Sequence, residues 1–274
     1  MSGKTAEALG HVLIVGGGNM GQALCAGLLR IEGVLPAAVT VAEPGEEKRA
    51  SIEAALGAAT VASAEQALPA STIIIAVKPN VVPSVCQQLA EAGIGGARVV
   101  SIAAGVATAK LEAALPQGTP VVRVMPNTPL LVGQGMSAVC GGSQAGEGDV
   151  QLVREVFASM GRAVILAEDK MDAVTALSGS GPAYFELVCE ALARSAEELG
   201  IPYETGCELA VQTMLGTARL IEQTGQSLPS AIEAVSSPGG TTVAALGAMR
   251  AGGLEQALDA GVKAAARRSA ELGA

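Results

Sequence analysis

Aromatic side chains and histidine are almost missing from this 274-residue chain. It has no tryptophan, two tyrosines and two phenylalanines, so its core must consist of alanine, valine, leucine and isoleucine. His11 is the only histidine, and it lies just before the first apolar run, where we expect a structural role for it. A Ser-His-Asp triad or a histidine-rich metal site would need a histidine elsewhere, which removes most hydrolase functions. We therefore predict no metal site.

Paired cysteines, long apolar runs and an excess of basic residues are also missing. The five cysteines lie far apart and none forms C-x-x-C, which favours neither a zinc site nor a disulfide framework. No signal-peptide pattern opens the chain and no apolar run approaches 18 residues, so we expect a soluble, cytoplasmic protein without a membrane partner. The net charge of −9 argues against nucleic acid as the main partner.

A glycine-rich stretch near the start of the chain carries the first functional signal. Residues 12–15 form a short apolar run typical of a buried strand, and a helical pattern of leucines begins at Leu24. Between them lies a G-x-G-x-x-G sequence made of Gly16, Gly17, Gly18, Asn19, Met20 and Gly21. Strand, glycine turn and helix in this order are typical of a dinucleotide-binding loop.

Each glycine of this loop has a mechanical reason in such a site. Gly16 permits the tight turn, Gly18 lets the backbone approach a pyrophosphate, and Gly21 lets the helix pack on the strand. The free amides at the start of the helix then face the phosphates. The alternative is a glycine-rich turn that binds no ligand.

An acidic residue follows the second predicted strand, which covers residues 38–42. Glu43 lies 22 residues beyond Gly21, about where a carboxylate can hydrogen-bond the adenosine ribose. Alternatively, Glu43 is a solvated turn residue. Lys48 and Arg49 follow closely and are candidates for binding a 2′-phosphate. Both NADPH and NADH therefore remain open as cofactors.

Apolar runs alternate with helical patterns through the first part of the chain. Further strands are predicted at residues 59–62, 71–77, 98–102 and 119–125, with a helix over 46–56 and a helical pattern through Val85 and Leu89. This alternation predicts a parallel sheet covered by helices, whose ligand lies beyond the carboxyl ends of the strands. Residues 78–79, 103–105 and 125–128 should therefore line one crevice with the glycine loop. The strand pattern fades after about residue 166.

The remainder of the chain has a helical pattern with glycine-rich interruptions. One of these, residues 236–242, has the sequence SSPGGTT and precedes a further helix. Backbone amides at the start of that helix are suited to hold a small carboxylate, and the hydroxyls of Ser237, Thr241 and Thr242 to orient a neighbouring polar atom. The alternative is an ordinary helix–helix turn with a threonine cap.

Four segments together resemble the pyrroline-5-carboxylate reductase family. They are IVGGGNMG, AVKP, VRVMPNTP, and AVTALSGSGPAYF with SSPGGTT, and the resemblance runs from Val12 to about Leu272. It implies an α/β fold with an N-terminal Rossmann dinucleotide-binding domain, residues 1–166, and a C-terminal all-α domain that mediates dimerisation, residues 167–274. It also implies homodimers with interlocked helical domains, often gathered into larger rings.

The family's roles map onto individual residues of this chain. The implied reaction is hydride transfer from NADPH or NADH to the C=N carbon of a cyclic imino acid, which converts L-1-pyrroline-5-carboxylate to L-proline. Thr242 matches the threonine that hydrogen-bonds the ring nitrogen, Ser237, Gly240 and Thr241 match the surroundings of the substrate carboxylate, and Glu168 matches an acidic residue near the ring. The implied cofactor contacts are Val15, Gly16, Gly17, Gly18, Asn19, Met20, Ala76, Val77, Lys78, Pro79, Ala103, Ala104 and Gly105.

Two other functions suit a dinucleotide-binding fold. A 3-hydroxyacid dehydrogenase would need a catalytic lysine in the helical half, where only Lys170 and Lys263 occur, neither in a glycine-flanked helical motif. A dinucleotide sensor without catalysis would not need the SSPGGTT segment. Two positions also depart from the family pattern, because Ser63 and Ala234 stand where some members have asparagine.

Overall fold

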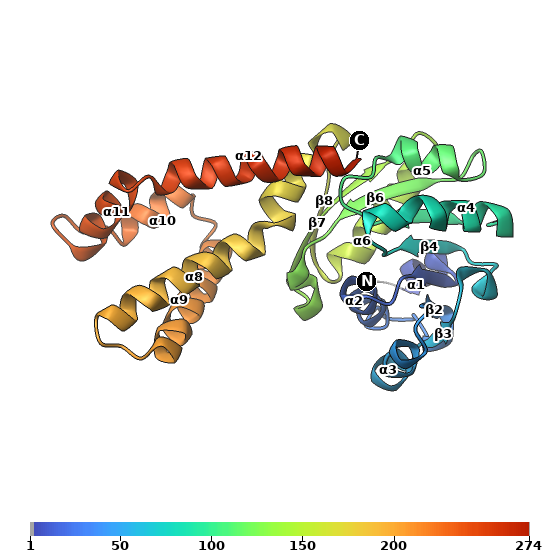
Figure 1. Ribbon diagram of the computed structural model, residues 1–274, viewed down its shortest axis with the longest axis horizontal. Helices are drawn as coiled ribbons and strands as arrows, with labels where there is room; N and C mark the ends of the chain where they lie inside the picture. The colour runs from blue at the N-terminus through green and yellow to red at the C-terminus, as the bar shows by residue number, and fades with distance from the viewer. Residues whose placement is uncertain (1–2, 274) are drawn as a thin grey trace. The chain divides into compact units, whose positions relative to one another are not determined.

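The computed structural model describes residues 3–273, which form two compact units (Figure 1). The first unit contains the described residues up to Ser180 together with those from Ala264 onward. The second unit is Gly181–Lys263. The chain therefore leaves the first unit once and returns to it near its C-terminal end.

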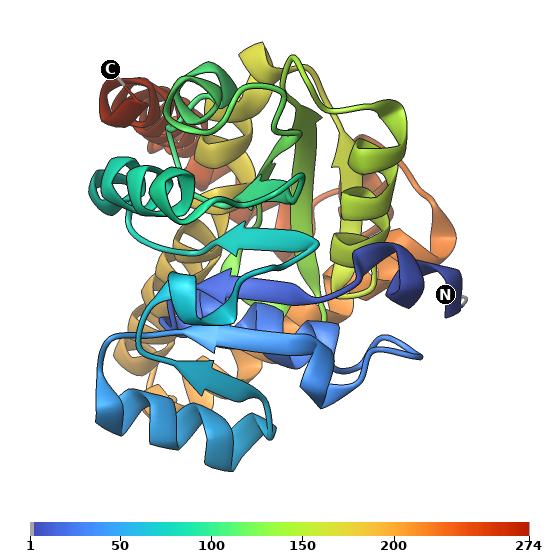
Figure 2. The ribbon, with the colours of Figure 1, turned by 90° about the vertical axis from the view of Figure 1, so that its right-hand side faces the viewer.

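An eight-stranded sheet forms the centre of the first unit (Figure 2). Its strands in order of sequence are β1 (Val12–Val15), β2 (Val39–Ala42), β3 (Ala59–Val61), β4 (Thr72–Ile75), β5 (Arg98–Ser101), β6 (Val121–Met125), β7 (Gly135–Gly141) and β8 (Gly161–Ile165). They lie in the order β3-β2-β1-β4-β5-β6-β7-β8, and the first six are parallel. The strand order reverses between β1 and β4, and such a switch point is where these folds bind ligands. The predicted α/β class with a Rossmann sheet is confirmed.

Helices cover both faces of this sheet. They are α1 (Gly3–Leu9), α2 (Asn19–Leu28), α3 (Glu46–Leu56), α4 (Val82–Ala92), α5 (Thr108–Ala114), α6 (Glu147–Ala158) and the short α7 (Met171–Val174). Adjacent residues of β1 point to opposite faces. Ile14 packs with Leu24 and Phe157 in one core cluster, while Leu13 packs with Leu89 in the other. Strands buried on both faces are nearly continuous apolar runs, which is why the sequence revealed them.

The end of the sheet differs from the predicted parallel arrangement. Strand β7 pairs antiparallel with β6, β8 is parallel to β7, and the sequence did not predict β7, β8 or α6. Only residues 126–134 connect β6 to β7, including the single 3₁₀ segment η4 (Thr128–Val132). A connection this short cannot form a crossover helix, so the next strand must run in the opposite direction.

The second unit is entirely helical. It contains α8 (Gly181–Glu198), α9 (Tyr203–Thr224), α10 (Leu228–Ala234), α11 (Thr241–Ala251) and the first part of α12 (Leu254–Gly273). The predicted helix start near Thr241 is present, and residues 199–202 separate α8 from α9. Within residues 3–273, no helix has the length and apolar character needed to cross a membrane.

The predicted domain boundary and the boundary of the compact units mark different points. Residues 166–167 follow the end of β8, where strands give way to helices. The compact units divide between Ser180 and Gly181 instead. Between these points lie η5 (Glu168–Lys170), α7 and the π-helical turn η6 (Thr175–Gly179), which pack with the sheet unit.

Candidate active site

In the glycine loop between β1 and α2, the surrounding protein requires glycine at two positions and leaves free space at a third. Gly16 has φ +110°, and a Cβ atom there would lie 2.7 Å from the carbonyl oxygen of Ala76. A Cβ atom on Gly21 would overlap the carbonyl oxygen of Gly16. Gly18 has an ordinary φ of −69°, and nothing lies within 4 Å of the position of its absent Cβ. No neighbouring protein atom therefore requires glycine at residue 18, and the free space there would let a ligand approach the backbone closely.

The start of α2 supplies the matching electrostatics. Gly18 is its N-cap, and no side chain caps the helix. Amides in the first turn of a helix have no intrahelical acceptor and carry partial positive charge. Gln22 Nε2 donates a 2.8 Å hydrogen bond to the carbonyl oxygen of Gly17, which holds the loop in place. This cradle suits the diphosphate of a dinucleotide.

Glu43 lies at the end of β2 with its carboxylate against the glycine loop. The amides of Gly17 and Gly45 each donate a 3.1 Å hydrogen bond to it, and Lys48 Nζ lies 3.4 Å away. Burial alone would raise the pKa of Glu43, but these two amides and Lys48 outweigh it and lower the pKa. Arg49 donates instead to the carbonyl oxygens of Glu43, at 3.0 Å, and Pro44, at 2.7 Å. Both cations near Glu43 therefore have partners within the protein.

The predicted cofactor contacts after β4 and β5 lie beside the glycine loop. The amide of Ala76 donates to the carbonyl oxygen of Val15 at 2.8 Å, and that of Ile102 donates to Ile75 at 3.1 Å. These bonds extend the sheet past its strand ends and bring the segments together. Ala76, Val77, Pro79 and Ala104 are half-buried, Lys78 is exposed, and Ala103 and Gly105 are buried. Of residues 103–105, Ala104 is thus the most accessible.

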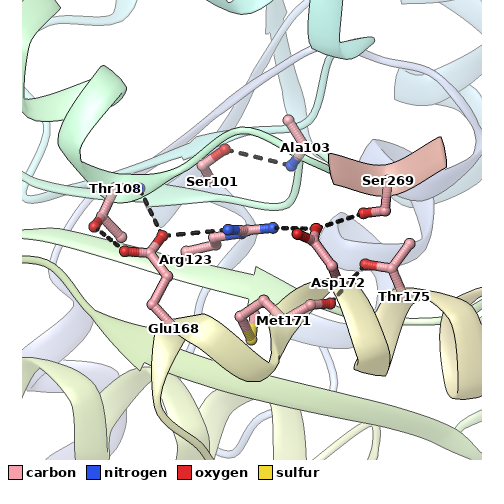
Figure 3. Close-up of polar contacts among 9 residues, drawn as sticks. All are labelled: Ser101, Ala103, Thr108, Arg123, Glu168, Met171, Asp172, Thr175 and Ser269. Carbon is pink, nitrogen blue, oxygen red and sulfur yellow. Dashed lines mark hydrogen bonds and ion pairs between the residues drawn. The ribbon is translucent and has the colours of Figure 1, made fainter. Parts of the chain in front are cut away.

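Glu168 lies in a polar cluster of the first unit (Figure 3). Its carboxylate accepts hydrogen bonds from the amide and the hydroxyl of Thr108, at 2.7 and 2.6 Å, and from Arg123 at 3.2 Å. Burial opposes ionisation, but the bonds from Thr108 and Arg123 outweigh it and lower the pKa of Glu168. Glu168 was predicted near the substrate ring, and in the structure its carboxylate holds the start of α5.

Arg123 is a functional candidate that the sequence did not reveal. It lies within β6 with 4 % of its surface exposed, between Glu168 and Asp172. A buried guanidinium requires carboxylate partners. The arginine within the apolar run VVRVM indicates that a buried cation needs carboxylate partners. The run does not show where in the chain those partners lie.

Two of the sequence motifs contact each other within the first unit. Asn127 Nδ2 donates to the carbonyl oxygen of Ser178 at 3.2 Å, and its Oδ1 accepts from the amide of Met136 at 2.8 Å. A Cβ atom on Gly179 would overlap the methyl group of Met125. The glycine at residue 179 therefore permits close packing of η6 on the end of β6.

The SSPGGTT segment forms a tight turn before α11 in the second unit. Gly239 has φ +70°, and the amide of Gly240 donates to the carbonyl oxygen of Ser237 at 2.9 Å. Gly240 is the N-cap of α11 and no side chain caps this helix, so the alternative of a threonine-capped turn is wrong. Thr242 is half-buried, whereas Ser237 and Thr241 are exposed. Among the described residues, these three hydroxyls have no hydrogen-bond partner. The turn thus offers amides and three available hydroxyls.

Comparison with known proteins gives a consistent result for both parts of the chain. Residues 168–272 match the family described as pyrroline-5-carboxylate reductase dimerisation, and residues 11–105 match the family described as NADP oxidoreductase, coenzyme F420-dependent. A pyrroline-5-carboxylate reductase of Pseudomonas aeruginosa is 40 % identical over 264 residues, which cover 96 % of each chain.

Solved structures agree with this similarity. A pyrroline-5-carboxylate reductase from Coxiella burnetii has a TM-score of 0.89 and 33 % identity, covering 97 % of this chain and 99 % of the other. A Plasmodium falciparum pyrroline carboxylate reductase with NADP bound has a TM-score of 0.87 and 27 % identity, with the same coverage. The similarity therefore extends over both compact units.

Proposed function

This chain belongs to the pyrroline-5-carboxylate reductase family, and from this premise we infer how its residues divide the work of the reaction. The protein is an NAD(P)H-dependent oxidoreductase that reduces the C=N bond of L-1-pyrroline-5-carboxylate to give L-proline, the last step of proline biosynthesis. When bound, the nicotinamide cofactor supplies the hydride, and the protein supplies position and electrostatics.

The glycine loop holds the dinucleotide in this proposal. The amides at the start of α2 bind the diphosphate, and Gly18 leaves space for it. The observation that carries the assignment is the open space at Gly18, because neither φ nor a neighbouring atom requires glycine there. Residues 76–79 and 103–105 form the adjacent wall, and the Glu43 carboxylate faces the adenosine ribose.

The turn before α11 holds the substrate. The amides near Gly240 and the hydroxyls of Ser237 and Thr241 bind the carboxylate, and Thr242 orients the ring nitrogen. A protonated imine is already electrophilic, so the site needs no strong protein acid, consistent with the absence of histidine from this turn. In this proposal Glu168 lies near the substrate ring and acts indirectly, by accepting hydrogen bonds from Thr108.

Spectrophotometry tests the reaction directly. Purified protein should oxidise NADPH or NADH when pyrroline-5-carboxylate is added, with the loss of nicotinamide absorbance as the signal. The same protein without the imine is the control for nonspecific oxidation. No absorbance change with either cofactor would contradict the proposal, including the assignment of both binding regions.

The dimerisation domain indicates that the chain oligomerises, and we propose an interlocked homodimer as the basic assembly. The second unit supports this because it exposes many large apolar residues, with Phe185 at 61 %, Leu187 at 65 % and Leu199 at 84 %. Exposed apolar surface of this extent marks an interaction site. A larger ring of dimers is a further part of the proposal.

The roles of the two parts of the chain and the location of the protein in the cell belong to the same proposal. Residues 1–166 bind the dinucleotide and residues 167–274 serve dimerisation and substrate binding, which the family match from residue 168 supports. A cytoplasmic location is supported by five cysteines that are all free thiols, as in reducing compartments.

A further inference from the structure

The loop of residues 102–107 joins β5 to α5 and contains the proposed cofactor contacts Ala103, Ala104 and Gly105. Its far end is fixed by Glu168, which binds the amide and the hydroxyl of Thr108 at the start of α5. The near end continues from β5 through the bond of Ile102 to β4. Between these two ends, the amide of Ala103 donates a 3.3 Å hydrogen bond to the hydroxyl of Ser101, and the rest of the loop is held by the elements that pack against it.

The last turn of α12 packs behind the middle of the loop, backbone against backbone. Gly105 has φ +78°, and a Cβ atom there would lie 2.7 Å from the carbonyl oxygen of Ser269 and 3.0 Å from the amide nitrogen of Gly273. A Cβ atom on Gly273 would in turn overlap the carbonyl oxygen of Gly105. Two glycines thus meet where any side chain would separate the loop from the helix.

A hydrogen bond from a buried serine holds this turn of α12 in place (Figure 3). Ser269 is 2 % exposed, and its hydroxyl donates a 2.7 Å bond to Asp172 Oδ1 on α7. Arg123 lies 3.8 Å from the same oxygen and 3.2 Å from Glu168 Oε1. One buried cation therefore lies between two carboxylates, of which Glu168 holds the end of the loop and Asp172 holds the helix behind it.

We propose that Ser269 and Asp172 are positioning residues for the nicotinamide cofactor, acting through the turn of α12 that supports residues 103–105. This inference rests on the proposed contact of those residues with the cofactor. If the bond is lost, the helix turn and Gly105 gain freedom, and the cofactor must order them on binding. Affinity for the cofactor falls, while the reduction of bound substrate changes little.

Ser269→Ala tests the inference in full-length protein. The dissociation constant of NADPH, measured by fluorescence titration without substrate, should rise about threefold to tenfold, the scale of one hydrogen bond. At saturating NADPH, kcat should stay within about twofold of the wild type. Ser159→Ala is the matched control, because the hydroxyl of this exposed serine bonds the carbonyl oxygen of Val156 in its own helix turn, and its NADPH affinity should not change.

Asp172→Ala breaks the same bond from the other side and keeps the test usable if Ser269→Ala folds poorly. It should weaken NADPH binding at least as much as Ser269→Ala, because it also removes the carboxylate that lies 3.8 Å from Arg123. The double variant should bind no more weakly than Asp172→Ala alone, since Ser269 acts through its bond to Asp172. Wild-type affinity in both single variants would overturn the inference.

Hydrogen exchange separates this inference from the cofactor assignment itself. In the wild type, NADPH should protect the amides of residues 102–107, and Ser269→Ala should speed their exchange before NADPH is added. Protection in the wild type with wild-type exchange and affinity in Ser269→Ala would overturn only the positioning role. Absence of protection in the wild type would reject the assignment of residues 103–105 to the cofactor, and the inference with it.

Discussion

Individual glutamates stabilise loops of the protein through hydrogen bonds from backbone amides. Glu43 receives the amides of Gly17 and Gly45, and Glu168 receives the amide of Thr108. In both cases several hydrogen bonds keep the carboxylate ionised despite its partial burial. The negative charges of these two residues therefore help to hold the loops. We expect removal of the charge at Glu43 to change cofactor specificity and removal of the charge at Glu168 to reduce stability.

Glu43→Ser tests the role of this carboxylate in cofactor choice. The substitution removes a negative charge that would repel a 2′-phosphate and frees Lys48 from its partner. Like charges brought together cost on the order of 1 kcal/mol or more. The ratio of kcat/KM for NADPH to that for NADH should therefore rise about tenfold.

The control for this prediction is Glu47→Ser, which removes an exposed carboxylate from the first turn of α3, four residues further along the chain. Its cofactor ratio should stay within about twofold of the wild type, a difference of about 0.4 kcal/mol. If Glu43→Ser also leaves the ratio unchanged, Glu43 does not reach the ribose.

Thr242→Ala distinguishes orientation of the substrate from proton donation. Loss of one orienting hydrogen bond costs about 0.5–1.5 kcal/mol, or roughly tenfold at most in kcat/KM. A proton donor would contribute on the order of 10²–10⁴-fold. A threonine hydroxyl is a poor acid and the imine can arrive protonated, so we expect the smaller loss, with cofactor affinity little changed.

Thr242→Ser keeps the hydroxyl and should keep most of the activity. Full activity in Thr242→Ala would remove this residue from the site. A thousandfold loss would show that the hydroxyl, or a water that it holds, delivers the proton.

Glu168→Gln tests the pH dependence of stability. Because the pKa of Glu168 is lowered in the folded protein, its contribution is complete above the ordinary carboxyl pKa of about 4.3 and is lost as the pH falls through the folded value. At pH 7 the substitution should reduce the free energy of unfolding by about 1–3 kcal/mol, the scale of hydrogen bonds to a charged group.

Urea unfolding of both proteins at pH 7 and near pH 3 checks this sign. The difference in the free energy of unfolding between the wild type and Glu168→Gln should shrink as the pH falls. Glu147→Gln, at an exposed position, serves as the control. A difference that grows in acid would contradict the direction of the shift.

At the scale of elements, the sequence predicted those features of the fold that a local residue pattern determines. Six strands and the glycine loop were found because apolar runs and turn glycines are contiguous in sequence. The reversed direction of β7 depends on the short connection after Met125, and the structure of α6 was not recognised at all.

Partners of buried polar residues were the other part that the sequence did not reveal. Arg123 meets Glu168 across 45 residues, and Ser269 meets Asp172 across 97. A single sequence contains no local pattern that joins residues so far apart. The motif resemblance singled out Glu168 as a candidate, although not the contacts that its carboxylate makes.

The glycine loop allows a matched pair of substitutions that separates folding from binding. Gly21→Ala places a methyl group on the carbonyl oxygen of Gly16 and should cost about 1–3 kcal/mol of stability, as overpacking does. Gly18→Ala meets no protein atom and should change stability by less than about 1 kcal/mol, the scale of an N-cap change. Its NADPH affinity should nevertheless fall about tenfold or more, because the methyl group occupies ligand space.

Thermal unfolding and NADPH titration of both variants check these expectations. Wild-type NADPH affinity in Gly18→Ala would mean that the loop does not approach the diphosphate. A fully stable Gly21→Ala protein would mean that α2 can move away from β1 without cost.

At the scale of the whole molecule, we expect the apolar surface of the second unit to determine the oligomeric state in solution. Substitution of Leu187 by Glu places a charge where 65 % of an apolar side chain is exposed in the single chain. If this surface lies between two subunits, the buried charge should shift the protein toward the 27.0 kDa monomer.

Sedimentation velocity at micromolar concentration measures this shift. Lys4→Glu, at an exposed position of the first unit, is the control and should sediment like the wild type. A wild-type protein that is a stable monomer would contradict the interlocked dimer.

The return of the chain to the first unit has a consequence for biosynthesis. A ribosome releases residues 12–165, which contain all eight strands, long before it releases Ser269 and Gly273. The loop at Gly105 can therefore form its strand connections early, but the helix turn that supports it arrives about 160 residues later. A nascent chain that already contains the whole sheet still lacks the helix turn that packs against this loop. If residues 103–105 bind the cofactor as proposed, full cofactor affinity should be reached only when translation has passed through the helical unit.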